Sequence, residues 1–259
     1  MNPHSTPFDA ARSLPAPSPS WAFFLDIDGT LLELAERPDM VHVDAALVKL
    51  LGRLQQAAGG ALALISGRSI ADVDTLFTPL ELAVAGQHGI ERRDAAGRTH
   101  QHAFPRELLR AAAVRLHAFA AAHPGLLLED KGHSLALHYR QAPQLADAAR
   151  AEAAAAAAEL GHEFELLAGK MVFELKPGGR DKGKVIEEYM QEAPFRGRAP
   201  VFVGDDLTDE YGFGVVNRMG GHAIKVGAGR SAARWRLADA QAVRAWLGDW
   251  VARFGPGAA

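Results

Sequence analysis

The sequence contains no cysteine, which excludes disulfide bonds and thiolate chemistry. It also contains no apolar run near the roughly 20 residues that a membrane-spanning helix needs. Neither sign of charge is in excess, because the formal net charge is only -3. Such a chain has no overall basic field to hold nucleic acid or an anionic membrane. These absences predict a cytoplasmic protein with no nucleic-acid, membrane or obligate protein partner.

What the sequence does contain is the apolar content of a folded protein. Hydrophobic residues make up 48% and charged residues 23%, which is ordinary for a globular chain. The segment 1–20 is rich in proline and lacks the apolar stretch of a signal peptide. We therefore predict a disordered leader over 1–20, followed by one large or two modest domains.

Short apolar runs alternate with amphipathic segments in the first and last thirds of the chain. The runs at 21–25, 61–65, 82–85, 200–203 and 222–226 are typical of buried strands, and most end in a polar loop. Helices are predicted between and after them, at 45–58, 69–77, 182–190, 208–217 and 239–253. This alternation predicts an α/β fold with a Rossmann-like parallel sheet and right-handed crossovers.

The middle of the chain has a different pattern. Helices are predicted at 105–122 and 143–159, and each precedes a pair of strands with a turn, within 126–140 and 164–176. The order indicates a smaller α+β domain inserted into the parallel core. The predicted division is a core of 21–102 and 180–259 with an α+β cap domain of 103–179.

Polar residues gather where the predicted parallel strands end, which is where open sheets of this kind bind ligands. The residues are Asp26, Asp28, Ser66, Arg68, Asp205, Asp206 and Asp209, with Lys182 at the start of a helix. Crowded carboxylates repel one another unless a cation joins them. Because the donors are oxygens, the sequence predicts a hard ion such as Mg²⁺.

This set of groups suits phosphoryl transfer. One carboxylate attacks phosphorus and forms an aspartyl-phosphate, and a second, two residues on, moves the proton. A cation, a lysine and a hydroxyl bind the phosphoryl oxygens, where negative charge is spread. Gly29 allows the backbone to approach the phosphate. We therefore predict a magnesium-dependent phosphatase whose nucleophile is Asp26.

The motifs also resemble, in order, those of the haloacid dehalogenase-like phosphatases. They are Asp26-Ile27-Asp28-Gly29-Thr30, Ser66, Lys182 and Gly204-Asp205-Asp206-Leu207-Thr208-Asp209. The resemblance implies that Asp26 is the nucleophile and Asp28 the general acid and base. It implies that Ser66 and Lys182 hold the phosphoryl group. Mg²⁺ would be bound by Asp26, Asp205 and the main-chain carbonyl of Asp28.

Four of these residues have a second interpretation. Asp209 is expected to support the metal site indirectly or through water, and Asp206 mainly to act as a structural cap. Ser66 could instead be the N-cap of helix 69–77, and Lys182 a solvated helix lysine. The occurrence of all four motifs at strand or helix ends favours the catalytic interpretation.

The α+β segment lies between the second and third motifs, where it can close over the site as a lid and admit a small soluble substrate. Its hairpins carry Glu129, Lys131, Lys170 and Glu174. Such acids and bases suit sugar hydroxyls, which both donate and accept hydrogen bonds. The alternative is an exposed sheet face with solvated charges.

Within the superfamily, the sequence resembles the trehalose-6-phosphate phosphatases, which have a type IIB cap. The strings that carry the resemblance are Leu-Asp-Ile-Asp-Gly-Thr-Leu (25–31), Ile-Ser-Gly-Arg (65–68), Gly-Gln-His-Gly (86–89), Lys-Gly-His-Ser-Leu-Ala-Leu-His-Tyr-Arg (131–140), Glu-Leu-Lys-Pro (174–177), Lys-Gly (182–183) and Gly-Asp-Asp-Leu-Thr-Asp-Glu (204–210). The resemblance implies trehalose 6-phosphate as the substrate. It also implies substrate contacts from Arg68, Glu129, Lys131, Lys170 and Glu174.

Two departures from the family pattern bear on fine specificity rather than on the chemistry. His133 stands where an aromatic residue is frequent, and Gln87-His88 replaces a commoner pair of small and acidic residues. Three other functions stay open. The chain could act on sucrose phosphate or mannosyl-phosphoglycerate, it could be a phosphomutase, or it could be a catalytically silent sensor of sugar phosphates.

Overall fold

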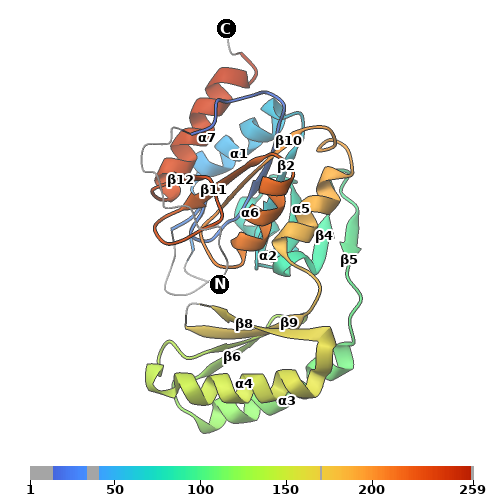
Figure 1. Cartoon of the computed structure of the whole chain (residues 1–259), viewed down its shortest axis with the longest axis vertical. Coiled ribbons are helices and arrows are strands. Elements are labelled where there is room, and N and C mark those ends of the chain that lie inside the picture. The colour runs from blue at the N-terminus through green and yellow to red at the C-terminus, as the bar shows by residue number, and fades with distance from the viewer. Residues whose placement is uncertain (1–13, 34–40, 170, 258–259) are drawn as a thin grey trace. The chain divides into compact units, whose positions relative to one another are not determined.

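The computed structural model describes residues 14–33, 41–169 and 171–257. Within it the chain forms two compact units, shown in Figure 1. The core unit runs to His100 and resumes at Asp181, and the inserted unit spans Gln101–Arg180.

The core unit is built on an eight-stranded sheet with the order β12-β11-β10-β1-β2-β3-β4-β5. Its strands are β1 (Trp21–Leu25), β2 (Leu62–Ile65), β3 (Ala83–Gly86), β4 (Glu91–Arg93), β5 (Thr99–Gln101), β10 (Ala199–Gly204), β11 (His222–Val226) and β12 (Trp235–Leu237). Neighbours from β12 to β3 are parallel, and β4 runs antiparallel to β3. The predicted α/β class with a parallel-sheet core is confirmed.

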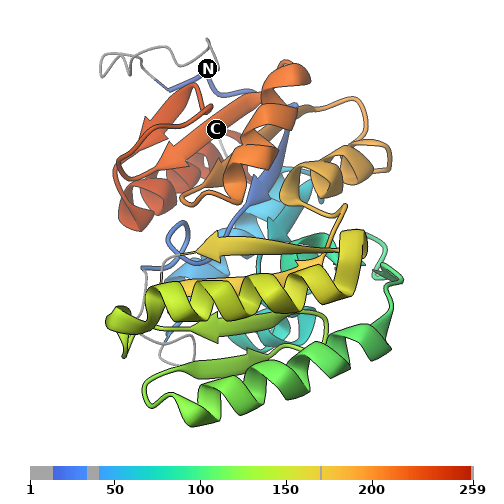
Figure 2. The same cartoon turned by 60° about the horizontal axis from the view of Figure 1, so that its bottom comes forward.

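Helices cover both faces of this sheet, as Figures 1 and 2 show. On one face α1 (Ala45–Ala57) packs against α7 (Ala240–Phe254), and on the other α5 (Lys182–Met190) packs against α6 (Asp209–Arg218). Helix α2 (Ile70–Phe77) connects β2 to β3. Burial from both faces explains why the central strands are continuous apolar runs in the sequence.

Aromatic side chains hold β1 at the centre of the sheet. Phe24 stacks on Phe195 with 5.4 Å between ring centroids, and Phe23 meets Trp250 edge-on at 4.8 Å. Neither strand residue is exposed at all. Large aromatic contacts of this kind contribute strongly to core stability. Because β1 is fixed on both faces, the loop that begins at Asp26 leaves the sheet from a rigid support.

The predicted leader, 1–20, is described only in part, because residues 1–13 lie outside the described residues. The main-chain carbonyl of Ser18 accepts a hydrogen bond from Trp250 Nε1 at 3.2 Å. In the described ranges, the chain has no helix with the length and apolar character to cross a membrane.

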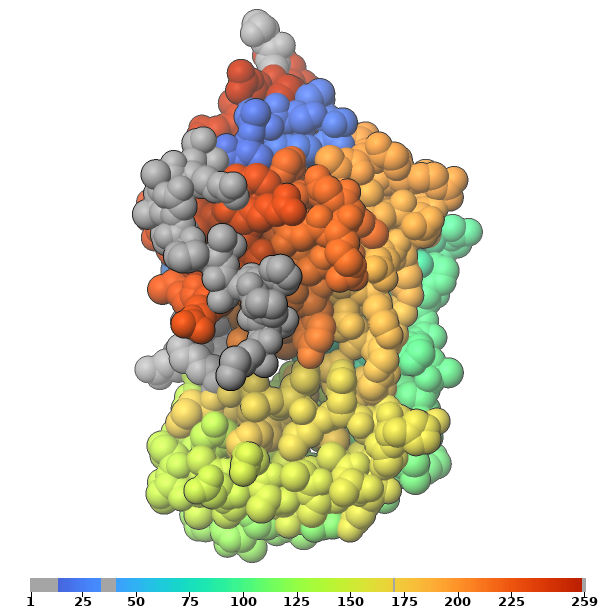
Figure 3. Space-filling model, viewed as in Figure 1, coloured from blue at the N-terminus to red at the C-terminus, as the bar shows by residue number. Residues whose placement is uncertain are grey.

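The inserted unit is a four-stranded antiparallel sheet with two helices on one face. The sheet order is β6-β7-β9-β8, formed by β6 (Leu127–Asp130), β7 (Leu135–His138), β8 (Phe164–Gly169) and β9 (Val172–Pro177). Helices α3 (Arg106–Ala122) and α4 (Ala146–Leu160) pack against each other, and their side chains form a continuous green-to-yellow surface in Figure 3. The predicted α+β class of this segment is confirmed.

The strand register separates an apolar face from a polar face in this sheet. Leu135 and Leu137 are buried in the core of the unit. Ala136 lies between them in sequence, and its partners in the adjacent strands are Glu129 and Glu174. Because side chains alternate along a strand, the two glutamates share the face opposite the leucines.

Candidate active site

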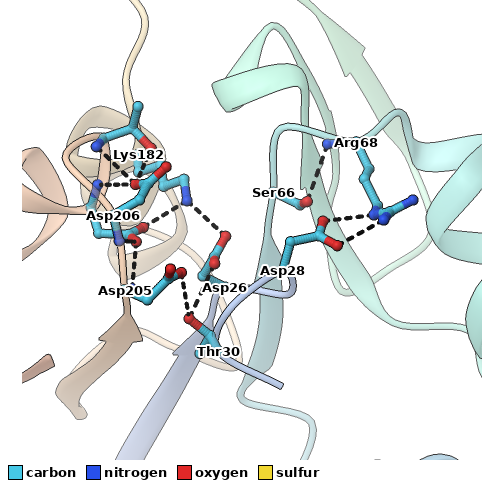
Figure 4. Close-up of polar contacts among 10 residues, drawn as sticks. Asp26, Asp28, Thr30, Ser66, Arg68, Lys182, Asp205 and Asp206 are labelled. Atoms are coloured by element: carbon cyan, nitrogen blue, oxygen red, sulfur yellow. Dashed lines mark hydrogen bonds and ion pairs between the residues drawn. The ribbon is translucent and has the colours of Figure 1, made fainter. Parts of the chain in front are cut away.

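Asp26 and Asp205 lie close together because each follows one of two neighbouring parallel strands. β1 pairs with β10 in parallel, with Leu25 opposite Val203, so the loops that follow leave the same edge of the sheet. The hydroxyl of Thr30 is 3.1 Å from Asp26 Oδ2 and 3.2 Å from Asp205 Oδ1 (Figure 4). Thr30 is fully buried. Its single hydroxyl therefore holds two acids from distant segments side by side.

Gly29 permits this close approach of the two loops. Its φ is +83°, in the left-handed region that favours glycine, and an added Cβ would lie 2.2 Å from Asp205 Oδ2. Any side chain here would displace the Asp205 carboxylate. Gly29 was predicted to let the backbone approach a phosphate, and in the structure it makes room for Asp205.

Lys182 is the buried cation that contacts Asp26. It is the first residue of α5, and its side chain is 2% exposed. Its Nζ donates to Asp26 Oδ1 at 2.7 Å and to Asp209 Oδ1 at 2.6 Å. Burial lowers the pKa of Lys182, but the attraction of the two carboxylates outweighs it and raises that pKa well above its ordinary value. The alternative of a solvated helix lysine is therefore wrong.

Asp209 organises the loop after β10 to a degree that the sequence did not indicate. Its carboxylate has no solvent exposure, and Oδ2 accepts hydrogen bonds from the backbone N–H groups of Asp205 and Asp206 at 2.8 and 2.9 Å. Its other oxygen accepts from Lys182. The three donors therefore belong to Lys182 and to the loop that contains Asp205. Asp209 thus links the Asp205 loop to the buried lysine.

Asp206 makes a local turn with the residues after it. Its Oδ1 accepts hydrogen bonds from Thr208 N at 2.8 Å, from Thr208 Oγ1 at 2.7 Å and from Asp209 N at 3.2 Å. Burial raises the pKa of Asp206, but Lys182 and these hydrogen bonds outweigh it, and the pKa falls to about 2. The carboxylate is therefore ionised and engaged at the start of α6, as a structural cap would be.

The acids of the site carry more negative charge than Lys182 offsets. Burial raises the pKa of Asp26 to about 7, although Lys182 opposes the change. Burial and the charges of Asp209 and Asp206 raise the pKa of Asp205 to about 6. Oxygens of Asp26, Asp205 and Asp209 lie within 4.8 Å of one another. This cluster could hold a metal ion, which would supply the missing positive charge.

The donor chemistry fits a hard divalent cation. Carboxylate oxygens are the ligands that Mg²⁺ and Ca²⁺ prefer. Asp209 already accepts three hydrogen bonds through its two oxygens. Asp26 and Asp205 accept fewer, which leaves lone pairs for a cation. These two residues are therefore the side chains that best fit as metal ligands.

Ser66 follows β2 and faces the same edge of the sheet. It is 1% exposed, and its Oγ accepts a hydrogen bond from the backbone N–H of Arg68 at 3.1 Å. This bond leaves the hydroxyl proton to be donated elsewhere. The N-cap of α2 is Ser69, which forms a capping box with Asp72. The alternative of Ser66 as the cap of that helix is therefore wrong.

Arg68 and Asp28 form a bidentate ion pair. Arg68 Nε donates to Asp28 Oδ2, and Nη2 donates to Asp28 Oδ1, both at 2.7 Å. Figure 4 shows the Asp28 carboxylate pointing towards Arg68 and away from Asp26 and Asp205. Both residues are expected near the substrate, but no pattern in the sequence indicates that they contact each other.

Two further features at this edge escaped the sequence analysis. Lys225 of β11 is 6% exposed and donates to the main-chain carbonyl of Asp205. The available signal was a single charged residue inside an apolar strand. His88 lies against the loop after β2, with its backbone N–H donating to Ser66 O at 3.0 Å. The Gln87-His88 pair, expected to bear only on fine specificity, thus packs against a predicted phosphoryl-binding loop.

The predicted substrate residues of the inserted unit that the structure describes make polar contacts in two groups, one around Glu174 and one around Glu129. Glu174 accepts hydrogen bonds from Ser134 Oγ at 2.8 Å and from Lys131 Nζ at 3.4 Å. Glu129 Oε2 lies 3.0 Å from His138 Nε2, and this contact lowers the pKa of Glu129 although burial opposes the change. The predicted Lys170 lies outside the described residues.

Three comparisons with known proteins agree with one another. A model of the trehalose-phosphatase family matches residues 24–241. The trehalose-6-phosphate phosphatase of Escherichia coli strain K12 is 48% identical over 233 residues, which are 90% of this chain and 87% of that protein. The crystal structure of a trehalose-6-phosphate phosphatase related protein has a TM-score of 0.72 at 26% identity, covering 88% of this chain and 96% of that one.

A more distant structure shows the wider fold. A haloacid dehalogenase-like hydrolase from Bacteroides thetaiotaomicron has a TM-score of 0.64 at 14% identity, covering 88% of this chain and 98% of that one. At this identity the likeness concerns the fold alone. The fold is the one that the motif order implied.

Proposed function

The chain belongs to the trehalose-phosphatase family, and we propose that it hydrolyses trehalose 6-phosphate to trehalose and inorganic phosphate. The observation that carries the proposal is the set of contacts made by the Asp26 carboxylate, in a chain that matches this family. Its carboxylate is held between Lys182 and Thr30 at the carboxyl edge of a parallel sheet, beside Asp205. This is the arrangement that an aspartyl-phosphate mechanism requires. The proposed location is the cytoplasm.

Asp26 is the proposed nucleophile. Hydrogen bonds from Lys182 to Oδ1 and from Thr30 to Oδ2 fix the direction of the carboxylate. One oxygen attacks phosphorus, the bond between phosphorus and the ester oxygen of the sugar breaks, and an aspartyl-phosphate forms. A water molecule then attacks phosphorus, the bond to Asp26 breaks, and phosphate leaves. The carboxylate is regenerated at the end of each turnover.

Asp28 is the proposed carrier of the proton. As a carboxylic acid it donates the proton to the leaving sugar oxygen, and as a carboxylate it then takes one from the attacking water. Ser66 and Lys182 bind oxygens of the phosphoryl group, Ser66 through the hydroxyl proton that its bond with Arg68 leaves available. A Mg²⁺ ion bound by Asp26, Asp205 and the main-chain carbonyl of Asp28 would offset the negative charge of the phosphoryl group.

The inserted unit is the proposed source of sugar specificity. Glu129, Lys131 and Glu174 offer acceptors and donors that suit the hydroxyl groups of a disaccharide. Lys170 belongs to the same proposal on the family resemblance alone. The connected cluster around Glu174 supports it, because side chains held by one another lose less conformational freedom when they bind.

The test of this function compares three sugar phosphates. Trehalose 6-phosphate is expected to be hydrolysed at a much higher kcat/KM than glucose 6-phosphate or sucrose 6-phosphate, because only trehalose fits the whole set of hydroxyl contacts. Phosphate release is measured with Mg²⁺ and with a chelator, and the metal-free enzyme should be inactive. Equal rates on all three esters would refute the trehalose assignment. Phosphate transferred to a sugar rather than released would indicate a phosphomutase.

A second measurement tests the metal site through stability. The pKa values of Asp26 and Asp205, about 7 and about 6, lie above the ordinary 3.8. From about pH 4 to about pH 7, the metal-free folded protein therefore binds more protons than the unfolded chain. Its free energy of unfolding falls as the pH rises through this range. A cation binds the ionised carboxylates. Stabilisation by Mg²⁺ is therefore expected to be larger at about pH 8 than at about pH 5.

Thermal unfolding with Mg²⁺ and with a chelator, at both pH values, measures this effect. Asp205→Asn should abolish most of the stabilisation by Mg²⁺. Asp74→Asn is the matched control, because Asp74 pairs with Arg93 through two short hydrogen bonds of 2.6 and 2.8 Å outside this cluster. Equal stabilisation by Mg²⁺ at both pH values in the unchanged protein would contradict the assignment of these ligands.

A further inference from the structure

We propose that Arg68 is a positioning residue that holds Asp28 in a resting orientation until a phosphate ester binds. The inference rests on the proposed function and adds a step to it. Its basis is the bidentate pair between the two side chains, with both donor–acceptor distances at 2.7 Å. Planar guanidinium and carboxylate groups joined in this way are firmly oriented.

The resting orientation cannot be the one that transfers the proton. Asp26 forms its new bond to phosphorus on one side, and the leaving oxygen departs on the opposite side, in line with it. Asp28 must place an oxygen within hydrogen-bond reach of that leaving oxygen. In Figure 4 its carboxylate points instead to Arg68. Both oxygens of Asp28 accept hydrogen bonds from Arg68, so proton transfer requires the pair to open.

The surroundings of Arg68 suggest what opens the pair. Its backbone N–H donates to Ser66 Oγ at 3.1 Å, and its carbonyl accepts from Gln87 N at 2.9 Å. The main chain of Arg68 is therefore fixed beside the hydroxyl that is proposed to bind the phosphoryl group. A phosphate dianion there attracts the guanidinium more strongly than the single charge of Asp28 does. Arg68 then changes partner from the carboxylate to the phosphoryl oxygens, and Asp28 is released.

The pair also has an electrostatic consequence for the acids around Lys182. Asp26, Asp205, Asp206 and Asp209 already crowd around Lys182. An unpaired Asp28 turned towards them would add another negative charge to this cluster. Arg68 keeps that charge paired and away from the nucleophile. Release of Asp28 is thereby coupled to the arrival of the substrate.

Leaving-group dependence distinguishes this role from simple substrate binding. A sugar alcohol is a poor leaving group that needs a proton, whereas the nitrophenolate of p-nitrophenyl phosphate leaves without one. Arg68→Gln is expected to lower kcat on both esters, because the phosphoryl oxygens lose a partner. The loss on trehalose 6-phosphate is expected to exceed the loss on p-nitrophenyl phosphate by about tenfold, because Asp28 is then no longer kept away from the nucleophile. In the Asp28→Asn background, Arg68→Gln should lower the rates on the two esters by the same factor within about twofold, because the extra loss on trehalose 6-phosphate acts through Asp28.

Other outcomes would overturn the proposal. Equal losses on both esters would mean that Arg68 only binds the phosphoryl group. A rise in KM for trehalose 6-phosphate with kcat unchanged would mean that it contacts the sugar. Additive losses in the double variant would mean that the two residues act independently. Arg93→Gln is the matched control, because it removes a bidentate arginine–aspartate pair away from the site and should leave the ratio of the two substrates unchanged.

A direct structural test does not depend on the folding of any variant. Crystals of the unchanged protein with Mg²⁺ and orthovanadate, a mimic of the phosphoryl group, should show Arg68 bound to vanadate oxygens and Asp28 turned to its apical oxygen. A retained pair at 2.7 Å beside bound vanadate would refute the exchange. Failure of the unchanged protein to hydrolyse trehalose 6-phosphate would instead refute the proposed function, and the vanadate structure would still decide the exchange.

Discussion

Replacing Asp26 with asparagine is expected to lower kcat for trehalose 6-phosphate by on the order of 10⁴-fold or more. The amide is nearly the same size as the carboxylate but cannot form the aspartyl-phosphate. The variant should also unfold at the same or a higher temperature than the unchanged protein at about pH 8 without metal. The reason is that burial raises the pKa of Asp26 to about 7, so its ionised form costs folding free energy.

The two readouts together separate a nucleophile from a structural acid. Phosphate release reports turnover, and thermal unfolding in the presence of a chelator reports stability. Asp74→Asn provides the same chemical change in the core unit, outside the site, and should retain turnover. An Asp26→Asn variant that still turns over would eliminate the proposed mechanism. A variant that is inactive because it is unfolded would show that Asp26 is needed for the fold.

The residues that lie together in this site could be predicted from the sequence because the topology of a parallel sheet determines where they lie. Asp26, Ser66 and Asp205 each follow an apolar run, and parallel strands bring such loops to one edge regardless of side-chain detail. Lys182 was expected beside them because it opens a predicted helix, and in the structure it is the first residue of α5. Composition and order were therefore sufficient to name the residues and the chemical class.

The contacts among these residues could not be predicted. Whether Asp28 faces Asp26 or Arg68 is decided by a side-chain rotamer, and no pattern in one sequence specifies it. The bridge from Thr30 to both Asp26 and Asp205 depends on sub-ångström positions of two loops from opposite ends of the chain. Asp209 looked like a supporting acid because three hydrogen bonds to its carboxylate are invisible in the sequence.

The missed strands have a related explanation. β4, β5 and β12 are three residues long, and the residues of β4 and β5 are largely charged or polar. A run of three residues shows no periodicity, and strands at or next to the edge of a sheet, as these three are, need no apolar face on both sides. By contrast the capping box of Ser69 and Asp72 was readable, since serine followed three residues later by an acid marks a helix start.

Replacing Lys182 with methionine is expected to damage both catalysis and stability, and the damage should depend on pH. The substitution leaves the carboxylates of Asp26 and Asp209 buried without their cation, a loss of about 3–5 kcal/mol for a pair of this kind. Because Lys182 lowers the pKa of both acids, its removal raises those pKa values further. The variant should therefore lose stability as pH rises through neutrality and regain part of it in acid, where the two carboxylates are protonated.

The double variant Lys182→Met/Asp209→Asn separates the two roles of the lysine. Removing the charge of Asp209 relieves its repulsion with Asp26. The unfolding temperature near neutral pH should therefore rise part of the way back to that of the unchanged protein. Turnover should not return, because the lysine that orients Asp26 and binds the phosphoryl oxygens is still absent, a deficit of about 10²-fold or more in kcat. If turnover recovered along with stability, Lys182 would act only as a structural counter-ion, and the phosphoryl group would have to be held by Ser66 and the metal without it.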